Sequence, residues 1–160
     1  MPRITALLHT TNDALRLGRC LETLYPCDEI VVVDHGSTDV TVRLARQYGA
    51  RVLPRQGSVS PPGAGLVVDL VAPGWVLCVD PRESLSESLA ASLFQWKSEP
   101  ALEPAFAVLV REETVNGWKE GQRAETRLVP AEWEQWEGRF PVNDARASVL
   151  EGALLRFAFP

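Results

Sequence analysis

The sequence is poor in the residues that build redox and metal centres. It has three cysteines, two histidines and one methionine among 160 residues. Cys20, Cys27 and Cys78 form no Cys-X-X-Cys pair, and His9 and His35 complete no familiar zinc-ligand spacing with them. We therefore expect reduced, structural thiols and no zinc site.

Long apolar segments and a surplus of basic residues are also missing. No apolar run approaches the roughly 20 residues that span a membrane, and residues 1–5 lead into a strand-like segment without the features of a signal peptide. Lys and Arg number 16 against 21 Asp and Glu, which gives a net charge of -5. A general nucleic-acid binder usually carries a basic face. These absences predict a cytoplasmic protein with no membrane span and no nucleic-acid partner.

The chain does contain enough apolar residues, 46%, for a single domain over residues 1–160. Continuous apolar and β-branched runs predict parallel strands that are covered on both faces. They lie at residues 3–9, 30–33, 50–53 and 75–79. Helical spacing of apolar residues between these runs predicts an α/β fold with a parallel sheet.

Three helices are expected after the N-cap candidates Asn12, Ser37 or Thr38, and Ser84 or Ser86. In chain order, their expected apolar faces carry Leu15, Cys20, Leu21 and Leu24; Val40, Leu44 and Tyr48; and Leu89, Leu93, Phe94 and Trp96. A loop at residues 54–63 and a short buried helix at residues 64–71 are also expected.

The second half of the chain is less regular. Residues 106–110 predict a strand, and Asn116-Gly117 is a strong hairpin signal. Residues 126–129 are expected in the returning arm, and a last strand is expected within residues 152–159.

Polar residues follow the predicted parallel strands, at the edge where ligands of open α/β sheets bind. The four segments at this edge are residues 10–13, 34–39, 54–63 and 80–83. We expect the functional site where they converge.

Three of these regions resemble family 2 glycosyltransferases. Residues 30–41, IVVVDHGSTDVT, are similar to the family motif IVVDDGSTDGT. Residues 3–13 resemble the opening strand and Asn-Glu turn, and residues 74–83, GWVLCVDPRE, resemble the segment ending in Asp-X-Asp-Glu. Residues 127–129 and 138–140 are similar to acceptor-side segments of bacterial lipopolysaccharide-core glucosyltransferases. The chain thus resembles a short, degenerate member of the family.

The resemblance implies a GT-A-like, Rossmann-like three-layer sandwich, whose mostly parallel central sheet has an antiparallel C-terminal part. It implies a nucleotide-binding half at residues 1–98 and a reduced acceptor-side half at residues 99–160. The expected ligand is a UDP-sugar or another nucleoside diphosphate sugar. The residues that the resemblance assigns to this ligand are Thr10, Asn12, Asp34, His35, Asp80 and Arg82.

The main departure from the family is Arg82, which stands where the second aspartate of Asp-X-Asp binds the metal. Mg²⁺ and Mn²⁺ need oxygen ligands, and two like charges ~4 Å apart repel by roughly 4 kcal/mol at an effective dielectric of about 20. We therefore expect no cofactor, with Asp80 the only remaining candidate ligand and Mg or Mn bound only if Arg82 turns away. Arg82 either contacts the diphosphate in place of the metal or forms an ordinary ion pair with Glu83 or another carboxylate.

Other departures leave the catalytic residues unassigned. His35 replaces the second aspartate of the Asp-Asp-Gly-Ser motif, and it is either a base contact or a turn residue. Gly65-Leu66 and Pro141-Val142 stand where the resemblance places Arg-Asn and His-Glu pairs. The sequence therefore predicts a nucleotide-sugar-binding protein that is weakly active or inactive, or alternatively a non-catalytic protein-interaction module. The C-terminal helices that usually build the acceptor site are missing, so we expect a homodimer to complete it.

Overall fold

The computed structural model describes residues 2–54, 70–99, 102–121 and 123–160. The first half contributes the strands β1 (Ile4–Thr10), β2 (Glu29–Asp34), β3 (Arg51–Pro54), β4 (Trp75–Cys78) and β5 (Glu83–Leu85). The second half contributes β6 (Phe106–Thr114), β7 (Gly117–Glu120), β8 (Glu125–Pro130) and β11 (Ser148–Arg156). The short strands β9 (Trp136–Glu137) and β10 (Phe140–Pro141) pair separately.

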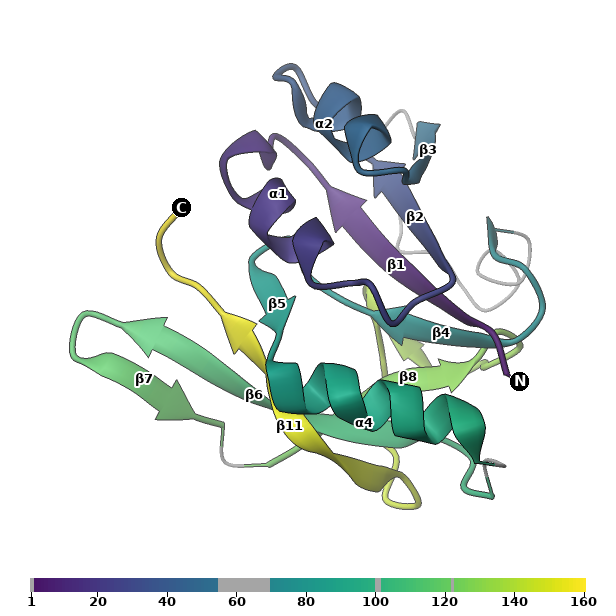
Figure 1. The fold of residues 1–160 in the computed structure, drawn as a ribbon. Coiled ribbons are helices and arrows are strands. Elements are labelled where there is room, and N and C mark those ends of the chain that lie inside the picture. The colour runs from purple at the N-terminus through teal and green to yellow at the C-terminus, as the bar shows by residue number, and fades with distance from the viewer. Residues whose placement is uncertain (1, 55–69, 100–101, 122) are drawn as a thin grey trace.

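One nine-stranded sheet passes through both halves, in the order β3-β2-β1-β4-β8-β6-β11-β5, with β7 beside β6 (Figure 1). Strands β1 to β4 are parallel, and β8 runs antiparallel to both β4 and β6. Strand β11 is parallel to β6 and antiparallel to β5. The predicted α/β class, with a mostly parallel sheet and an antiparallel second part, is confirmed.

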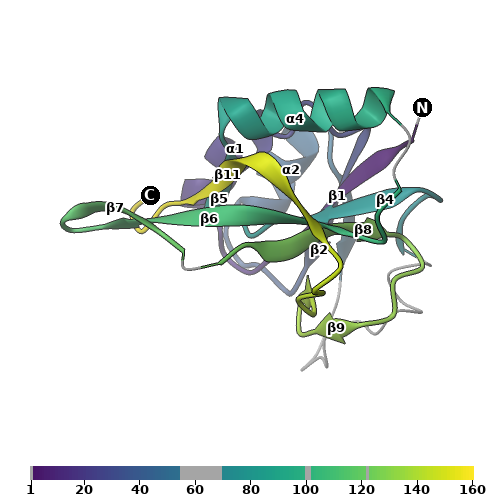
Figure 2. The ribbon, with the colours of Figure 1, turned by 90° about the horizontal axis from the view of Figure 1, so that it is seen from below.

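Helices α1 (Ala14–Glu22), α2 (Thr41–Gln47) and α4 (Glu87–Ser98) bury their apolar residues in the main core on one face of the sheet. Alternate residues of β1 enter opposite faces, with Ile4 and Leu8 in this core and Leu7 in a second one. Trp136 and Phe140 pack on the second core. Figure 2 shows α4 and β9 on opposite sides of the sheet. Both faces of the parallel strands are therefore covered, as their continuous apolar sequence predicts.

The three cysteines are free thiols. Burial raises the pKa of Cys27 and of Cys78 to about 12, so both thiols stay protonated at neutral pH. The expected reduced state agrees with this packing. None of the helices in the described ranges is long and apolar enough to cross a membrane.

The predicted N-cap of the first helix, Asn12, is wrong. Its N-cap is Asp13, and Asn12 has a φ of 53°, in the left-handed region that asparagine tolerates. Leu15, expected on the apolar face, is 83% exposed. The reason is that Leu17, Cys20 and Leu21 form the buried face, and Leu15 lies about 200° around the helix from Leu17.

The second helix also begins differently. Its N-cap is Val40 rather than Ser37 or Thr38, and Asp39 accepts a 2.9 Å hydrogen bond from the backbone nitrogen of Thr41. The buried helix residues are Thr41 and Ala45, whereas Val40 and Tyr48 are exposed. The third prediction is confirmed for Ser86, whose hydroxyl accepts from the Leu89 nitrogen at 3.1 Å. Ser84 instead lies in β5, which the sequence does not predict, and Phe94 is half exposed.

Two strand predictions in the second half need correction. The returning arm of the Asn116-Gly117 hairpin is β7, while residues 126–129 belong to β8 and pair with β4 and β6. The last strand begins at Ser148 and ends at Arg156, so it starts before the predicted range. The loop expected at 54–63 and the helix expected at 64–71 fall almost entirely outside the described residues.

Gly152 lies where β11 changes register against β6, and it lets the first turn of α4 approach closely. Its φ is +104°, and an added Cβ would lie 2.6 Å from the Cα of Leu89. Beside it, Ser86 and Ala153 exchange hydrogen bonds in both directions at 3.0 Å. Only glycine fits this contact without displacing α4.

We expect Gly152→Ala to lower the free energy of unfolding by about 3 kcal/mol, because backbone strain and overpacking both contribute. Gly117→Ala is the matched control, since Gly117 has a φ of +105° and nothing within 4 Å of an added Cβ. Gly117→Ala should lower the free energy of unfolding by the backbone strain alone, about 1–2 kcal/mol. Urea unfolding of both variants measures the difference, and equal losses would contradict the close approach.

Candidate functional site

The turns after β1, β2 and β4 meet at one edge of the sheet. Parallel pairing aligns Thr10 with Asp34 and Leu7 with Cys78, so the carboxyl ends of the three strands are neighbours. The backbone nitrogen of His35 donates to the carbonyl oxygen of Thr10 at 2.9 Å. Three of the four segments expected at this edge are therefore brought together, and the fourth, residues 54–63, is described only at Pro54.

Asp34 is a buried acceptor at the end of β2, and 4% of its surface is exposed. Its carboxylate accepts from the hydroxyl of Thr10 at 2.7 Å, and from the backbone nitrogen and the hydroxyl of Ser37 at 2.9 and 2.6 Å. Burial acts to raise the pKa of Asp34, but these hydrogen bonds outweigh it and hold the pKa below its ordinary value. Thr10 itself is fully buried. Asp34 is thus an ionised acceptor that organises its own turn.

Asn12 joins the first turn to the second. Its side-chain oxygen accepts from the backbone nitrogens of Thr38 and Asp39 at 2.7 and 3.3 Å, and its backbone nitrogen donates to the Ser37 hydroxyl at 2.9 Å. The left-handed backbone of Asn12 makes this reach possible. Asn12 therefore holds the two turns in register instead of capping α1.

His35 faces a second histidine on the neighbouring strand. Its Nε2 lies 2.9 Å from Nδ1 of His9, and the two rings stack with centroids 5.2 Å apart. A hydrogen bond between two imidazole nitrogens needs one donor and one acceptor, so the two facing nitrogens share a single proton. His9 also borders a cavity of about 10 Å³ beside Asp80. This space is far smaller than a nucleotide.

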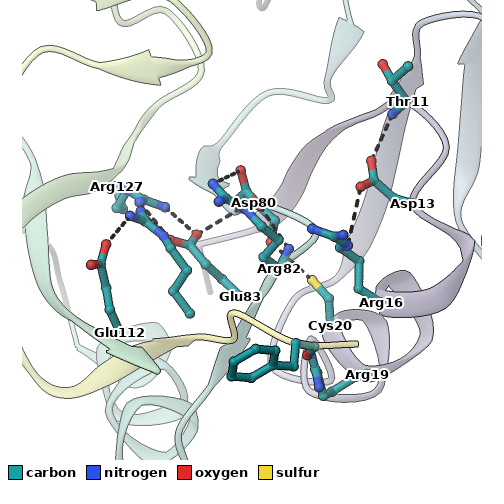
Figure 3. Close-up of polar contacts among 12 residues, drawn as sticks. Thr11, Asp13, Arg16, Arg19, Cys20, Asp80, Arg82, Glu83, Glu112 and Arg127 are labelled. Carbon is teal, nitrogen blue, oxygen red and sulfur yellow. Dashed lines mark hydrogen bonds and ion pairs between the residues drawn. The ribbon is translucent and has the colours of Figure 1, made fainter. Parts of the chain in front are cut away.

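Asp80 and Arg82 form an ion pair in the turn after β4 (Figure 3). Oδ1 of Asp80 accepts from the backbone nitrogen and from Nε of Arg82 at 2.9 Å, and Oδ2 lies 3.3 Å from Nη2. Burial acts to raise the pKa of Asp80, but the hydrogen bonds and charge of Arg82 hold it below its ordinary value. Arg82 therefore points back onto Asp80 and not away from it.

The carboxylate of Asp80 is already paired with a cation. Both carboxylate oxygens of Asp80 are engaged by a cation, and no cluster of three His, Cys, Asp or Glu side chains in the described ranges is arranged to hold a metal. The same local geometry recurs in the loop before β11. There Oδ1 of Asp144 accepts from the backbone nitrogen and Nε of Arg146 at 2.8 and 3.0 Å, and Oδ2 from Nη2 at 2.8 Å. The two Asp-X-Arg sequences thus form the same set of contacts in two different turns.

Glu83, which lies in the expected segment 80–83, supports this turn together with two arginines that sequence reasoning did not assign to the site. Glu83 is fully buried, and it pairs with Arg127 of β8 and Arg156 of β11 at 2.8 Å each. A signal was present for Arg127, because an arginine inside an apolar strand needs a buried partner. Nothing in the sequence identified Glu83 as that partner, since the two residues are far apart along the chain.

A cavity of about 170 Å³ lies on the side of Arg82 that faces the second half of the chain. Its lining residues are Arg82, Glu112, Glu113, Arg156, Phe157 and Ala158. Both carboxylates are engaged there, Glu112 with Arg156 at 2.7 Å and Glu113 with the backbone nitrogens of Ala158 and Phe159 at 3.2 and 3.3 Å.

Comparison with curated proteins finds glycosyltransferases. Uncharacterized glycosyltransferases of Rickettsia felis and Rickettsia prowazekii are 37% and 34% identical over 92 residues, which is 56% of this chain and 32% and 31% of those proteins. The lipopolysaccharide core biosynthesis glycosyltransferase LpsC of Rhizobium meliloti is 44% identical over 45 residues, 28% of this chain and 17% of LpsC. The chain spans about a third of the length of the Rickettsia relatives. No model of a known protein family matches the sequence.

Solved structures share the architecture over more of the chain. S. aureus TarS in complex with UDP-GlcNAc has a TM-score of 0.66 and 18% identity, covering 99% of this chain and 59% of that one. Glucosyl-3-phosphoglycerate synthase from Mycobacterium tuberculosis, in complex with Mn²⁺, UDP and phosphoglyceric acid, has a TM-score of 0.51 and 20% identity, covering 72% and 45%. At these identities the likeness shows the fold. Sequence and architecture together confirm the expected resemblance: the chain is similar to glycosyltransferases over 56% of its length, and its fold matches that of GT-A structures.

Proposed function

We propose that this domain binds a nucleoside diphosphate sugar at the carboxyl ends of β1, β2 and β4 without a divalent metal, and transfers the sugar weakly or not at all. The observation that carries the proposal is the ion pair between Asp80 and Arg82 in the turn after β4. The Arg82 guanidinium lies beside the carboxylate that the resemblance assigns to ribose or metal.

The chemistry of the edge supports a nucleotide ligand. Asp34 and Asp80 are ionised acceptors, and carboxylates accept strong hydrogen bonds from ribose hydroxyls and base N–H groups. TarS, which shares the architecture, was solved with UDP-GlcNAc. UDP is therefore the first ligand to test.

Arg82 can serve a diphosphate because its present contact is easily exchanged. The side chains of Arg82 and Asp80 are 45% and 21% exposed, and a solvent-exposed ion pair contributes only about 0–1 kcal/mol. Ribose hydroxyls would satisfy Asp80 while the planar guanidinium turns to two phosphate oxygens. The proposed binding thus replaces one charge pair by another.

Weak or absent transfer follows from the groups that remain. Sugar transfer needs a base for the acceptor hydroxyl and positive charge for the leaving diphosphate. The two carboxylates that line the cavity beside Arg82, Glu112 and Glu113, already accept hydrogen bonds from Arg156 and from the chain after β11. We therefore assign no catalytic base among the residues that the structure describes.

One observation favours a second function, a non-catalytic protein-interaction module. The polar side chains at the edge satisfy one another, as in the pair of Thr10 with Asp34 and the contacts of Asn12 with Thr38. These bonds hold the turns together without a ligand. The two functions differ in their response to nucleotides.

We expect UDP to raise the thermal unfolding midpoint equally with Mn²⁺ and with a chelator, because binding stabilises the folded state by mass action. Arg82→Ala should weaken metal-free UDP binding about 10- to 100-fold, the loss expected for a charged hydrogen bond of roughly 1.5–3 kcal/mol. Isothermal calorimetry measures the affinities.

Arg146→Ala is the matched control, since it removes an ion pair of the same geometry in the loop before β11. Its UDP affinity should equal that of the unsubstituted protein. Stabilisation that appears only with Mn²⁺ would contradict the proposal. No response to UDP, GDP or CDP would leave the interaction module as the better account.

Arg82→Asp tests whether the positive charge of Arg82 is what excludes a divalent ion. It returns a second carboxylate to the turn after β4, and two carboxylates with nucleotide oxygens suit Mn²⁺. We expect UDP binding by this variant to become dependent on Mn²⁺, with about 10-fold or greater gain on adding the ion. UDP binding that stays equal with and without Mn²⁺ would show that Arg82 does not exclude the metal.

A further inference from the structure

The buried carboxylate of Glu83 is the centre of a charge network around the turn that carries Asp80 and Arg82. It accepts five hydrogen bonds at 2.8 to 3.1 Å: two from Arg127, two from Arg156 and one from the backbone nitrogen of Asp80. Figure 3 shows Glu83 between Arg127 and Asp80. The contact with Asp80 links the network directly to the site.

Strands of the second half therefore support a turn of the first half. Nη1 of Arg127 also donates to the Cys78 carbonyl at 3.1 Å, where β4 ends. Immediately after Arg156, the backbone nitrogen of Phe157 donates to the Arg82 carbonyl at 2.9 Å. The turn is thus held at its beginning by Arg127 of β8, at Asp80 by Glu83, and at Arg82 by Phe157, the residue that follows β11.

The two arginines differ in what their removal would cost. Arg127 is fully buried, so its loss would empty a large volume in the core and leave Glu83 paired only with the partly exposed Arg156. The side chain of Arg156 is 22% exposed, and Arg127 would still donate two bonds to Glu83 without it. A variant at Arg156 should therefore still fold, while the Glu83 carboxylate is held less firmly because it has lost two hydrogen bonds.

We propose that Arg156 is a positioning residue, which acts through Glu83 to fix the backbone of Asp80 for nucleotide binding. The inference rests on the proposed function, because it assigns a role in the same site. Glu83 and Arg156 do not contact the nucleotide in this account. They determine where the carboxylate of Asp80 lies when ribose or phosphate arrives.

The first test needs no ligand. In Arg156→Met the amide ¹H–¹⁵N resonance of Asp80 should shift, because its hydrogen bond to Glu83 weakens, and Arg156→Lys should restore part of the shift. Arg3→Met is the control, since Arg3 pairs with Glu29 at the opposite end of β1 and β2. Circular dichroism confirms that each variant is folded. An unchanged Asp80 resonance in Arg156→Met would overturn the proposal.

The second test measures UDP affinity in a double-mutant cycle. Arg156→Met should weaken UDP binding about 10-fold, the scale of coupling between residues in one network, and by less than about 2-fold in an Asp80→Asn background. Equal losses in the two backgrounds would show a general structural effect and overturn the positioning role alone. Absence of UDP binding by the unsubstituted protein would overturn the proposed function, and the positioning role with it.

Discussion

The arrangement of the site depends on one buried carboxylate. Glu83 has no exposed surface, and its charge is balanced only because arginines from β8 and β11 reach it. Moving a charged group from water into the protein interior costs several kcal/mol, so a buried carboxylate must be paired and hydrogen-bonded. The pairing obliges the second half of the chain to close against the turn after β4. The turn after β4, which belongs to the first half of the chain, is therefore supported by arginines of the second half.

In the ion pair of Asp80 with Arg82, the positive charge beside the carboxylate comes from a side chain of the protein. The pair of Asp144 and Arg146 has the same contacts, so the Asp-X-Arg spacing permits this geometry in two different turns. What differs is the position. The first pair lies at the edge where the turns after β1 and β2 meet it, and the second lies in the loop before β11. Position in the fold, more than local geometry, makes Arg82 the candidate for a phosphate contact.

Much of the first half could be predicted because its signals are local. The apolar runs around Leu7, Val32 and Leu77 are continuous, which is typical of parallel strands buried on both faces. Their alignment brought Thr10, Asp34 and Asp80 to one edge, where sequence reasoning expected them. The Ser86 cap was likewise visible from residue type and spacing.

The errors arose where a tertiary contact competes with a local preference. Asn12 is a favourable N-cap, yet its side chain bonds the turn after β2, which requires a left-handed backbone. Strand β5 is three residues long and begins with Glu83, so its sequence has no apolar pattern that would predict a strand. The partners Arg127 and Arg156 lie 44 and 73 residues from Glu83, and spacing alone cannot connect them.

The central claim is that a guanidinium, and not a divalent ion, accompanies the nucleotide at this edge. Crystals grown with UDP and Mn²⁺ and measured at the manganese absorption edge test it most directly. We expect UDP along the turns after β1, β2 and β4, with the Arg82 guanidinium on its phosphates and no anomalous peak near Asp80. A manganese peak at bonding distance from the Asp80 carboxylate, bridging to the diphosphate, would contradict it.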